Sequence, residues 1–97
     1  MEFRLMDLDH SVYDIERLAE YVLLGFEDDE FSLIRKINQN DYPRFNLLVK
    51  ILNGGDRGHH FSLYVENSPR PHDVMSKGPL IEKEIKRIKE SLAKIQD

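Results

Sequence analysis

Alternation of apolar and polar residues predicts three strands in the middle of the chain and a shorter one at its start. The segments 44–52 and 59–66 alternate cleanly, because every second residue of each is apolar. These apolar residues are Phe45, Leu47, Val49 and Ile51 in the first segment and Phe61, Leu63 and Val65 in the second. The segment 31–38 alternates less regularly, because Arg35 interrupts it, and a short strand is predicted over 3–8.

Apolar residues at helical spacing predict a first helix over 12–26. They are Val12, Ile15, Leu18, Val22 and Phe26. Ser11 and Asp14 have the spacing of a capping box at its start. Gly25 offers a left-handed stop, and the acidic run 27–30 is then interpreted as a solvated loop.

A second helix is predicted from Pro79 onward. Its apolar residues form a narrow seam with the spacing of a coiled coil: Ile81, Ile85, Ile88, Leu92 and Ile95. Gly78 suits the N-cap position, and Pro79 suits the first helical position because its missing N–H would have no helical partner there.

The predicted order of elements is therefore (β)αβββα, an α+β fold in a single domain spanning residues 1–97. The connections 39–43 and 53–58 are short and rich in turn residues, which favours antiparallel hairpins. We expect a three- to four-stranded antiparallel sheet with both helices on one face. The apolar residues of the two clean strands should pack against Ile85, Ile88 and Leu92.

The opposite face of this sheet is predicted to be half apolar. It should present Ile34, Leu48, Leu52 and Tyr64 among Ser32, Lys36, Asn46, Lys50, His60 and Ser62. A partly exposed apolar face of this kind can close a homodimer or receive another protein. Coverage of the face by the segment 3–8 or by a terminal segment is the alternative.

Composition excludes several classes of chemistry. The chain has 97 residues, 40% of them hydrophobic and 33% charged, and no cysteine, so disulfides, thiolate metal sites and cysteine nucleophiles are absent. The acidic N-terminus lacks the apolar run of a signal peptide, and the longest apolar run, 21–24, is too short to cross a bilayer. We expect a cytoplasmic protein without membrane contact.

Charge is distributed unevenly around a net value of −4. Residues 1–31 hold ten acidic and two basic side chains, whereas residues 32–97 hold eight acidic and twelve basic ones. One hypothesis is that Asp7, Asp9 and the run 27–30 mimic a nucleic-acid backbone and block a basic groove on another protein. Mixing of the two halves in the fold would remove this asymmetry.

Polar and titratable residues gather among turn residues over 53–79, which marks this stretch as the candidate site. The candidate ligand-binding residues are Arg57, His60, Arg70, His72 and Lys77. If the protein is an enzyme, His60 and His72 are its candidate catalytic residues. Arg70 and Lys77 could reinforce an anion site at the start of the last helix, where backbone N–H groups point outward.

The histidines do not have the spacing of a metal site. His59 and His60 are adjacent on a predicted strand, so their side chains point to opposite faces and cannot hold one ion together. We therefore predict no metal and no cofactor.

A histidine beside cations could instead catalyse RNA cleavage, by taking a proton from a ribose hydroxyl. The run Gly58-His59-His60 and the later Pro71-His72 resemble the small mRNA-cleaving toxins of the HicA family, which also have an αβββα order. That resemblance implies a ribonuclease, but the second helix matches in position alone and this chain is longer. The same order resembles the double-stranded-RNA-binding domain, although the loop over 40–43 has no histidine to enter a minor groove.

Three functional hypotheses follow from these residues. The first is a small binding or regulatory module without enzymatic activity, which acts through a protein partner or homodimer and contacts an anion or nucleic acid at the 57–77 edge. The second is a histidine-dependent ribonuclease or other phosphate-handling enzyme. The third is the acidic mimic of nucleic acid.

Overall fold

The computed structural model describes residues 1–6, 11–52 and 58–93, which form six strands and two helices. The elements are, in chain order, β1 (Glu2–Met6), α1 (Val12–Ala19), β2 (Val22–Glu27), β3 (Glu30–Lys36), β4 (Arg44–Leu52), β5 (Gly58–Glu66), β6 (Val74–Met75) and α2 (Pro79–Ala93). This confirms the predicted α+β class, with more strands than the three or four expected.

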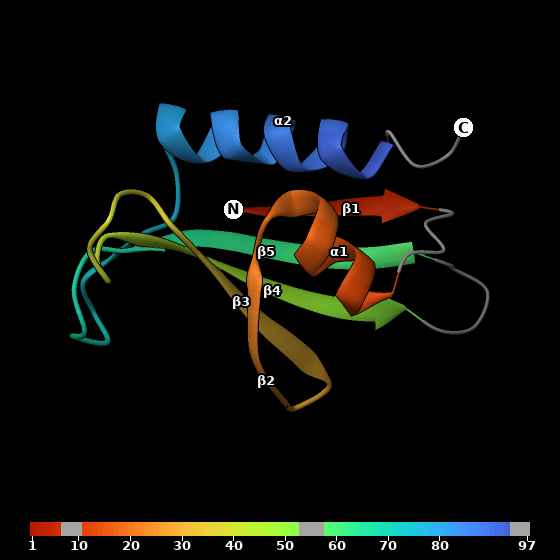
Figure 1. The fold of residues 1–97 in the computed structure, drawn as a ribbon, viewed down its shortest axis with the longest axis horizontal. Helices are drawn as coiled ribbons and strands as arrows, with labels where there is room; N and C mark the ends of the chain where they lie inside the picture. The colour runs from red at the N-terminus through yellow and green to blue at the C-terminus, as the bar shows by residue number, and fades with distance from the viewer. Residues whose placement is uncertain (7–10, 53–57, 94–97) are drawn as a thin grey trace.

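The six strands form one antiparallel sheet in the order β1-β5-β4-β3-β2 (Figure 1). Strands β2 to β5 make a meander, as the short connections predicted. Strand β5 pairs with β4 along its whole length, so β1 and the two-residue strand β6 share its other side. The edges of the sheet are therefore β2 on one side and β1 with β6 on the other.

Both helices lie on one face of this sheet, as predicted (Figure 1). Helix α2 packs on β5, and α1 packs against α2. The apolar residues of alternate positions on β4 and β5 point to this helical side and are almost completely buried. They include Phe45, Leu47, Val49, Phe61, Leu63 and Val65, which confirms the predicted core.

The apolar seam of α2 belongs to the same core. Ile81, Ile85, Ile88 and Leu92 are at most 8% exposed, whereas the fifth predicted member, Ile95, lies outside the described residues. The sheet of the same chain buries this seam, which confirms the predicted packing of Ile85, Ile88 and Leu92 and leaves none of its described residues for a coiled coil. Gly78 accepts a hydrogen bond from the Glu82 N–H at 3.0 Å, as expected of an N-cap carbonyl.

The first helix is shorter than predicted. The Ser11–Asp14 capping box is present, but α1 ends at Ala19, where Glu20 adopts a left-handed conformation with φ 62°. The second half of the predicted helix is strand β2. Val22 and Phe26 fit a helical spacing by coincidence, since Tyr21, Val22 and Phe26 are also residues that strands favour.

The acidic run 27–30 is largely exposed, as predicted for a solvated loop, but the connection is a two-residue hairpin turn whose flanking residues belong to β2 and β3. Asp28 and Asp29 both have positive φ, 53° and 64°, between the paired residues Glu27 and Glu30. Two consecutive positive φ angles are typical of the two-residue turns that match the twist of a hairpin, and Asp tolerates this conformation better than most residues. Two acidic residues of the run thus make the turn that joins β2 to β3.

Candidate functional site

The face of the sheet opposite the helices carries no helix or strand within residues 1–6, 11–52 and 58–93, and we call it the open face. Strand register arranges its side chains in rows across the sheet. One central row is Val22, Ile34, Asn46 and Tyr64, and the next is Gly25, Ser32, Leu48, Ser62 and Glu2. The register confirms the predicted composition of this face, whose middle carries uncharged residues except for Glu2 at the β1 edge.

The uncharged middle is partly exposed to solvent. Val22 is 59% exposed and Leu24, in the bulge of β2, is 54% exposed, whereas Ile34, Leu48 and Tyr64 are half-buried. Burial raises the pKa of the Tyr64 hydroxyl, and the charge of the nearby Glu66 carboxylate adds to the effect. Tyr64 therefore stays a neutral, partly apolar surface at physiological pH.

Charged rows frame this middle at both ends of the strands. At one end, Arg44 Nε donates to Glu66 Oε1 at 2.9 Å, and Lys36 pairs with Asp41 at 3.2 Å. At the other end, Lys50 lies opposite His60, which in turn lies opposite Arg4.

His60 belongs to this second charged row, where it contacts two side chains of β1. Arg4 Nε donates to its Nδ1 at 3.3 Å, and its Nε2 lies 3.0 Å from Glu2 Oε1. Both contacts are satisfied by the neutral imidazole with its hydrogen on Nε2. A general base needs a free lone pair, and Arg4 occupies the one that His60 has in this tautomer, so Arg4 would have to move before His60 could accept a proton.

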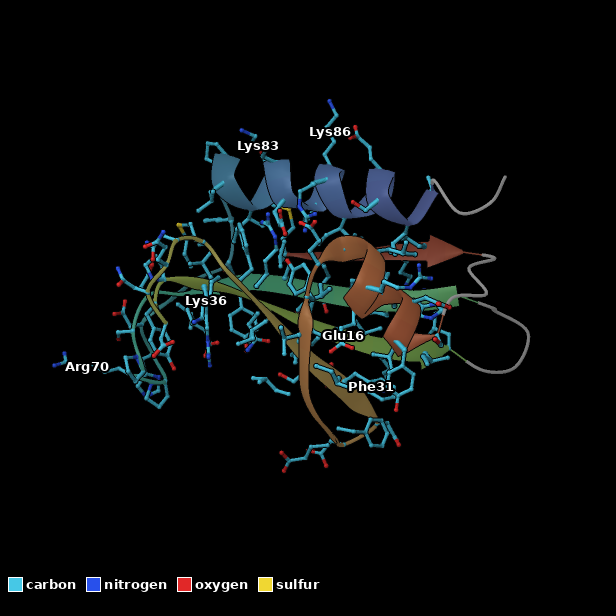
Figure 2. All side chains as sticks on the ribbon, in the orientation of Figure 1. Glu16, Phe31, Lys36, Arg70, Lys83 and Lys86 are labelled. Carbon is cyan, nitrogen blue, oxygen red and sulfur yellow. The ribbon has the colours of Figure 1, made fainter. Side chains whose placement is uncertain are left out.

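The candidate residues after β5 lie far from His60. Arg70 and His72 are exposed in the connection to β6, and Lys77 is exposed just before α2. His60 and Glu66 lie six positions apart on β5, a span of about 20 Å, and Arg70 follows beyond Glu66. No small ligand can therefore contact both His60 and Arg70. Figure 2 shows the Arg70 side chain extending away from the molecule. Arg57 lies outside the described residues, and a shared anion site for Arg70, His72 and Lys77 stays a prediction.

His59 confirms the expected division between faces. His59 is 3% exposed on the helical side, stacked 6.0 Å from the ring of Phe61, while His60 lies on the open face. In the part of the chain that the structure describes, no three His, Asp or Glu side chains gather as a metal site would require. Nor does that part contain a helix long and apolar enough to cross a membrane.

The acidic segment proposed as a nucleic-acid mimic is described only in part. Asp7 and Asp9 lie outside the described residues, and the run 27–30 forms the β2–β3 turn at the β2 edge. The acidic side chains of this turn therefore lie at one corner of the sheet, and mimicry of nucleic acid stays a prediction.

A buried ionic cluster on the helical side was not predicted. Glu84 of α2 is 4% exposed and accepts hydrogen bonds from three side chains. Tyr21 donates at 2.7 Å, Arg35 at 3.4 Å, and Arg87 from both Nε at 2.8 Å and Nη2 at 2.9 Å. Arg87 Nη2 also donates to the Ala19 carbonyl at 2.6 Å, which ties α2 to the end of α1.

The cluster changes how its members titrate. Burial raises the pKa of the Tyr21 hydroxyl far above its ordinary value, and the Glu84 charge adds to the shift. The hydrogen bonds that Arg87 donates to the Glu84 carboxylate raise the pKa of Arg87. One sequence signal could have indicated the cluster, because Glu84 follows Ile81 by three residues and precedes Ile88 by four, which places its carboxylate on the apolar side of the helix.

Comparison with models of known protein families, with curated proteins and with solved structures found no match to this chain. Arguments about function therefore depend on the residues and their arrangement.

Proposed function

We propose that the protein is a binding module without enzymatic activity, which associates with protein through the open face of its sheet. The observation that carries the proposal is the row pattern of this face. Uncharged and apolar residues occupy its middle, and charged residues occupy both ends. Protein interfaces have this composition, a core depleted of charge inside a polar rim.

The edge of β2 is a less suitable contact, although it also exposes apolar side chains. Glu16 Oε2 accepts a hydrogen bond from the Leu23 N–H at 2.6 Å, so the backbone at the start of this edge already has a partner. A bulge between Leu23 and Gly25 interrupts the regular strand. Bulges and charged residues at an edge are devices that prevent pairing with another strand. We therefore place the contact on the face and not on the edge.

A second copy of this chain is the occupant that the charges favour. Consider two copies stacked through their open faces, with a two-fold axis between them that runs parallel to the strands. The same ends of the strands then lie over each other, and the β1 edge of one copy lies over the β2 edge of the other. The acidic β2–β3 turn and Arg4 lie at the same end of the strands, on opposite edges. In such a dimer the acidic turn of each copy would face Arg4 of the other copy, which is electrostatically favourable.

The area of the open face determines how tightly two copies are expected to associate. Five strands about 4.8 Å apart and four rows about 6.6 Å apart cover roughly 20 Å by 20 Å. This is less than the roughly 800 Å² that each partner contributes to a standard stable interface. We expect a reversible dimer with a dissociation constant in the micromolar range.

Sedimentation equilibrium between about 1 μM and about 1 mM protein tests the proposal. Wild type should change from monomer to dimer over this range. Leu48→Glu puts a charge in the middle of the face, and Val22→Glu does so at a 59% exposed position where misfolding is not expected. Both should remain monomeric, because an unpaired charge would be desolvated in the contact.

Tyr13→Glu is the matched control. Tyr13 is 69% exposed on α1, away from the open face, so the same change in charge should leave association unaltered. A wild-type monomer at every concentration would contradict self-association, as would equal association of all three variants.

A further inference from the structure

A cleft of about 530 Å³ opens on the helical side of the molecule, between α2 and the end of β3 with the start of β4. Its volume falls in the range of about 300–1,000 Å³ that small-molecule sites occupy. The open face lies on the other side of the sheet, so a ligand here would not compete with the proposed protein contact. We call this site the α2 cleft.

Apolar side chains form one part of the cleft wall. Ile37 follows β3, Phe45 lies at the start of β4, and Leu80 lies in the first turn of α2. Leu80 is 41% exposed, although it belongs to the helix that supplies the core seam. An apolar group placed in the cleft would cover part of Leu80 and Ile37 and gain free energy from that burial.

Cations dominate the rest of the wall. Arg35, Lys83, Lys86 and Arg87 line the cleft together with the acids Glu84 and Glu90. Figure 2 shows Lys83 and Lys86 extending from α2 on the side away from the sheet, so they contribute to the rim. The excess of cations over acids favours an anionic ligand.

Arg35 is the cation best placed to contact such a ligand. The Nε and Nη2 atoms of Arg87 are already bonded to Glu84 and Ala19. Within the described residues, the Arg35 side chain makes a single hydrogen bond, to Glu84 at 3.4 Å, and it is 30% exposed. A guanidinium has five N–H donors, so Arg35 keeps donors for an incoming oxyanion while Glu84 holds it in place.

We infer that the α2 cleft binds a small organic oxyanion, a carboxylate or a phosphate monoester that carries an apolar group. Arg35 receives the oxyanion, Lys83 and Lys86 supply positive potential at the rim, and Ile37 and Leu80 cover the apolar group. The buried Glu84 carboxylate neutralises one of the two guanidiniums and leaves the other to attract the ligand.

Amide chemical shifts of the ¹⁵N-labelled protein provide the test, with phenyl phosphate and phenylacetate as separate probes. For probes of about ten non-hydrogen atoms that bind with the efficiency of drug-sized ligands, we expect dissociation constants of about 5 mM, so the titrations should extend to about 50 mM. The shifts should concentrate on residues 35–37 and 80–87. The probe that binds more tightly identifies the preferred oxyanion.

Two further probes separate the parts of the proposed ligand. Benzyl alcohol keeps the aromatic ring without the charge, and inorganic phosphate keeps the charge without the ring. Each should bind at least tenfold more weakly than the better aromatic anion. Equal binding of benzyl alcohol would overturn the proposal of an anion site, because the cleft would then be merely apolar.

Arg35→Gln should weaken binding of the aromatic anion at least tenfold. Lys36→Gln is the matched control, since it removes the same charge from the next residue, whose side chain lies on the opposite face of β3. Its effect should stay within twofold. Arg35→Gln is expected to stay folded because Tyr21 and Arg87 still bond Glu84; if it does not, the wild-type comparison of probes decides. Shifts that scatter over exposed lysines, or no saturation, would overturn the proposal.

Discussion

The two faces of the sheet differ in how far their charged side chains are exposed to solvent. On the helical side, Glu84 is 4% exposed and has hydrogen bonds from three side chains. On the open face, the Lys36–Asp41 pair has side chains 51% and 81% exposed, and Glu2 beside His60 is 70% exposed. Exposed pairs contribute little to stability because water solvates each partner, whereas breaking a buried cluster leaves charges without solvation. We therefore expect the helical side to determine stability and the open face to determine association.

Removal of the buried carboxylate should have the largest effect. Glu84→Ala leaves Tyr21, Arg35 and Arg87 without their shared acceptor, and we expect the free energy of unfolding to fall by about 3–5 kcal/mol. Urea denaturation measures this value. Glu82→Ala, on the exposed side of the same helix, should change it by less than about 0.5 kcal/mol. Similar values for both variants would mean that water replaces Glu84 as a partner.

Truncation of one apolar side chain on each side of the sheet compares packing directly. Ile88→Ala should cost about 2–5 kcal/mol, because Ile88 is 0% exposed and its removal leaves a cavity in the core. Leu48→Ala should cost about 1 kcal/mol in dilute protein, since Leu48 is only half-buried on the open face. Equal costs at low concentration would show that the open face is covered in the monomer, contrary to the proposed interface.

The smallest expected effect is a difference in alkaline stability. The folded pKa of Tyr21 lies above the value of about 10 for an unfolded tyrosine, so the folded chain retains a proton that the unfolded chain releases. The free energy of unfolding should therefore be fully retained below about pH 10 and fall as the pH rises further. Tyr21→Phe should fall less steeply, although Tyr64 contributes in the same direction.

Tyr13→Phe is the control for this measurement, because Tyr13 is 69% exposed on α1. Its pH profile should follow that of wild type. Denaturation curves between about pH 7 and pH 11 measure the slopes, across the range where tyrosines ionise. Identical slopes for Tyr21→Phe and wild type would contradict a role for the buried hydroxyl in alkaline unfolding.

Elements with a long, regular pattern of apolar and polar residues were predicted correctly, and elements with a short pattern were not. Strand β4 has the predicted bounds, and β5 begins one residue earlier than predicted, because clean alternation over many residues fits only a strand. The prediction failed at β2, where a short apolar segment satisfied both helical and extended spacing. The end of α1 depends on the left-handed Glu20, a residue without a strong preference for that conformation.

For the candidate sites, the sequence predicted which residues share one face of the sheet, but not which distant residues lie close together. Alternation along each strand predicted that Ile34, Leu48 and Tyr64 would share the open face, and the register confirms it. The suspected 57–77 edge was inferred from proximity in sequence. In the fold, β5 runs from His60 at one end of the sheet to Glu66 at the other, and Arg70 lies beyond that second end. The α2 cleft needed Arg35 and Leu80, which are 45 positions apart in the chain.

By itself, the sequence determined the α+β class, the central strands, the last helix and the core that they share, because each depends on the periodicity of neighbouring residues. Only the tertiary structure decided that the sheet of the same chain buries the isoleucine seam and that Tyr21 bonds Glu84 across 63 residues. It also decided that the uncharged middle of the open face is exposed at the β2 edge and half-buried or buried toward the centre. Periodicity states which side chains share a face, whereas the packing of distant elements determines what covers that face and which charges lose their water.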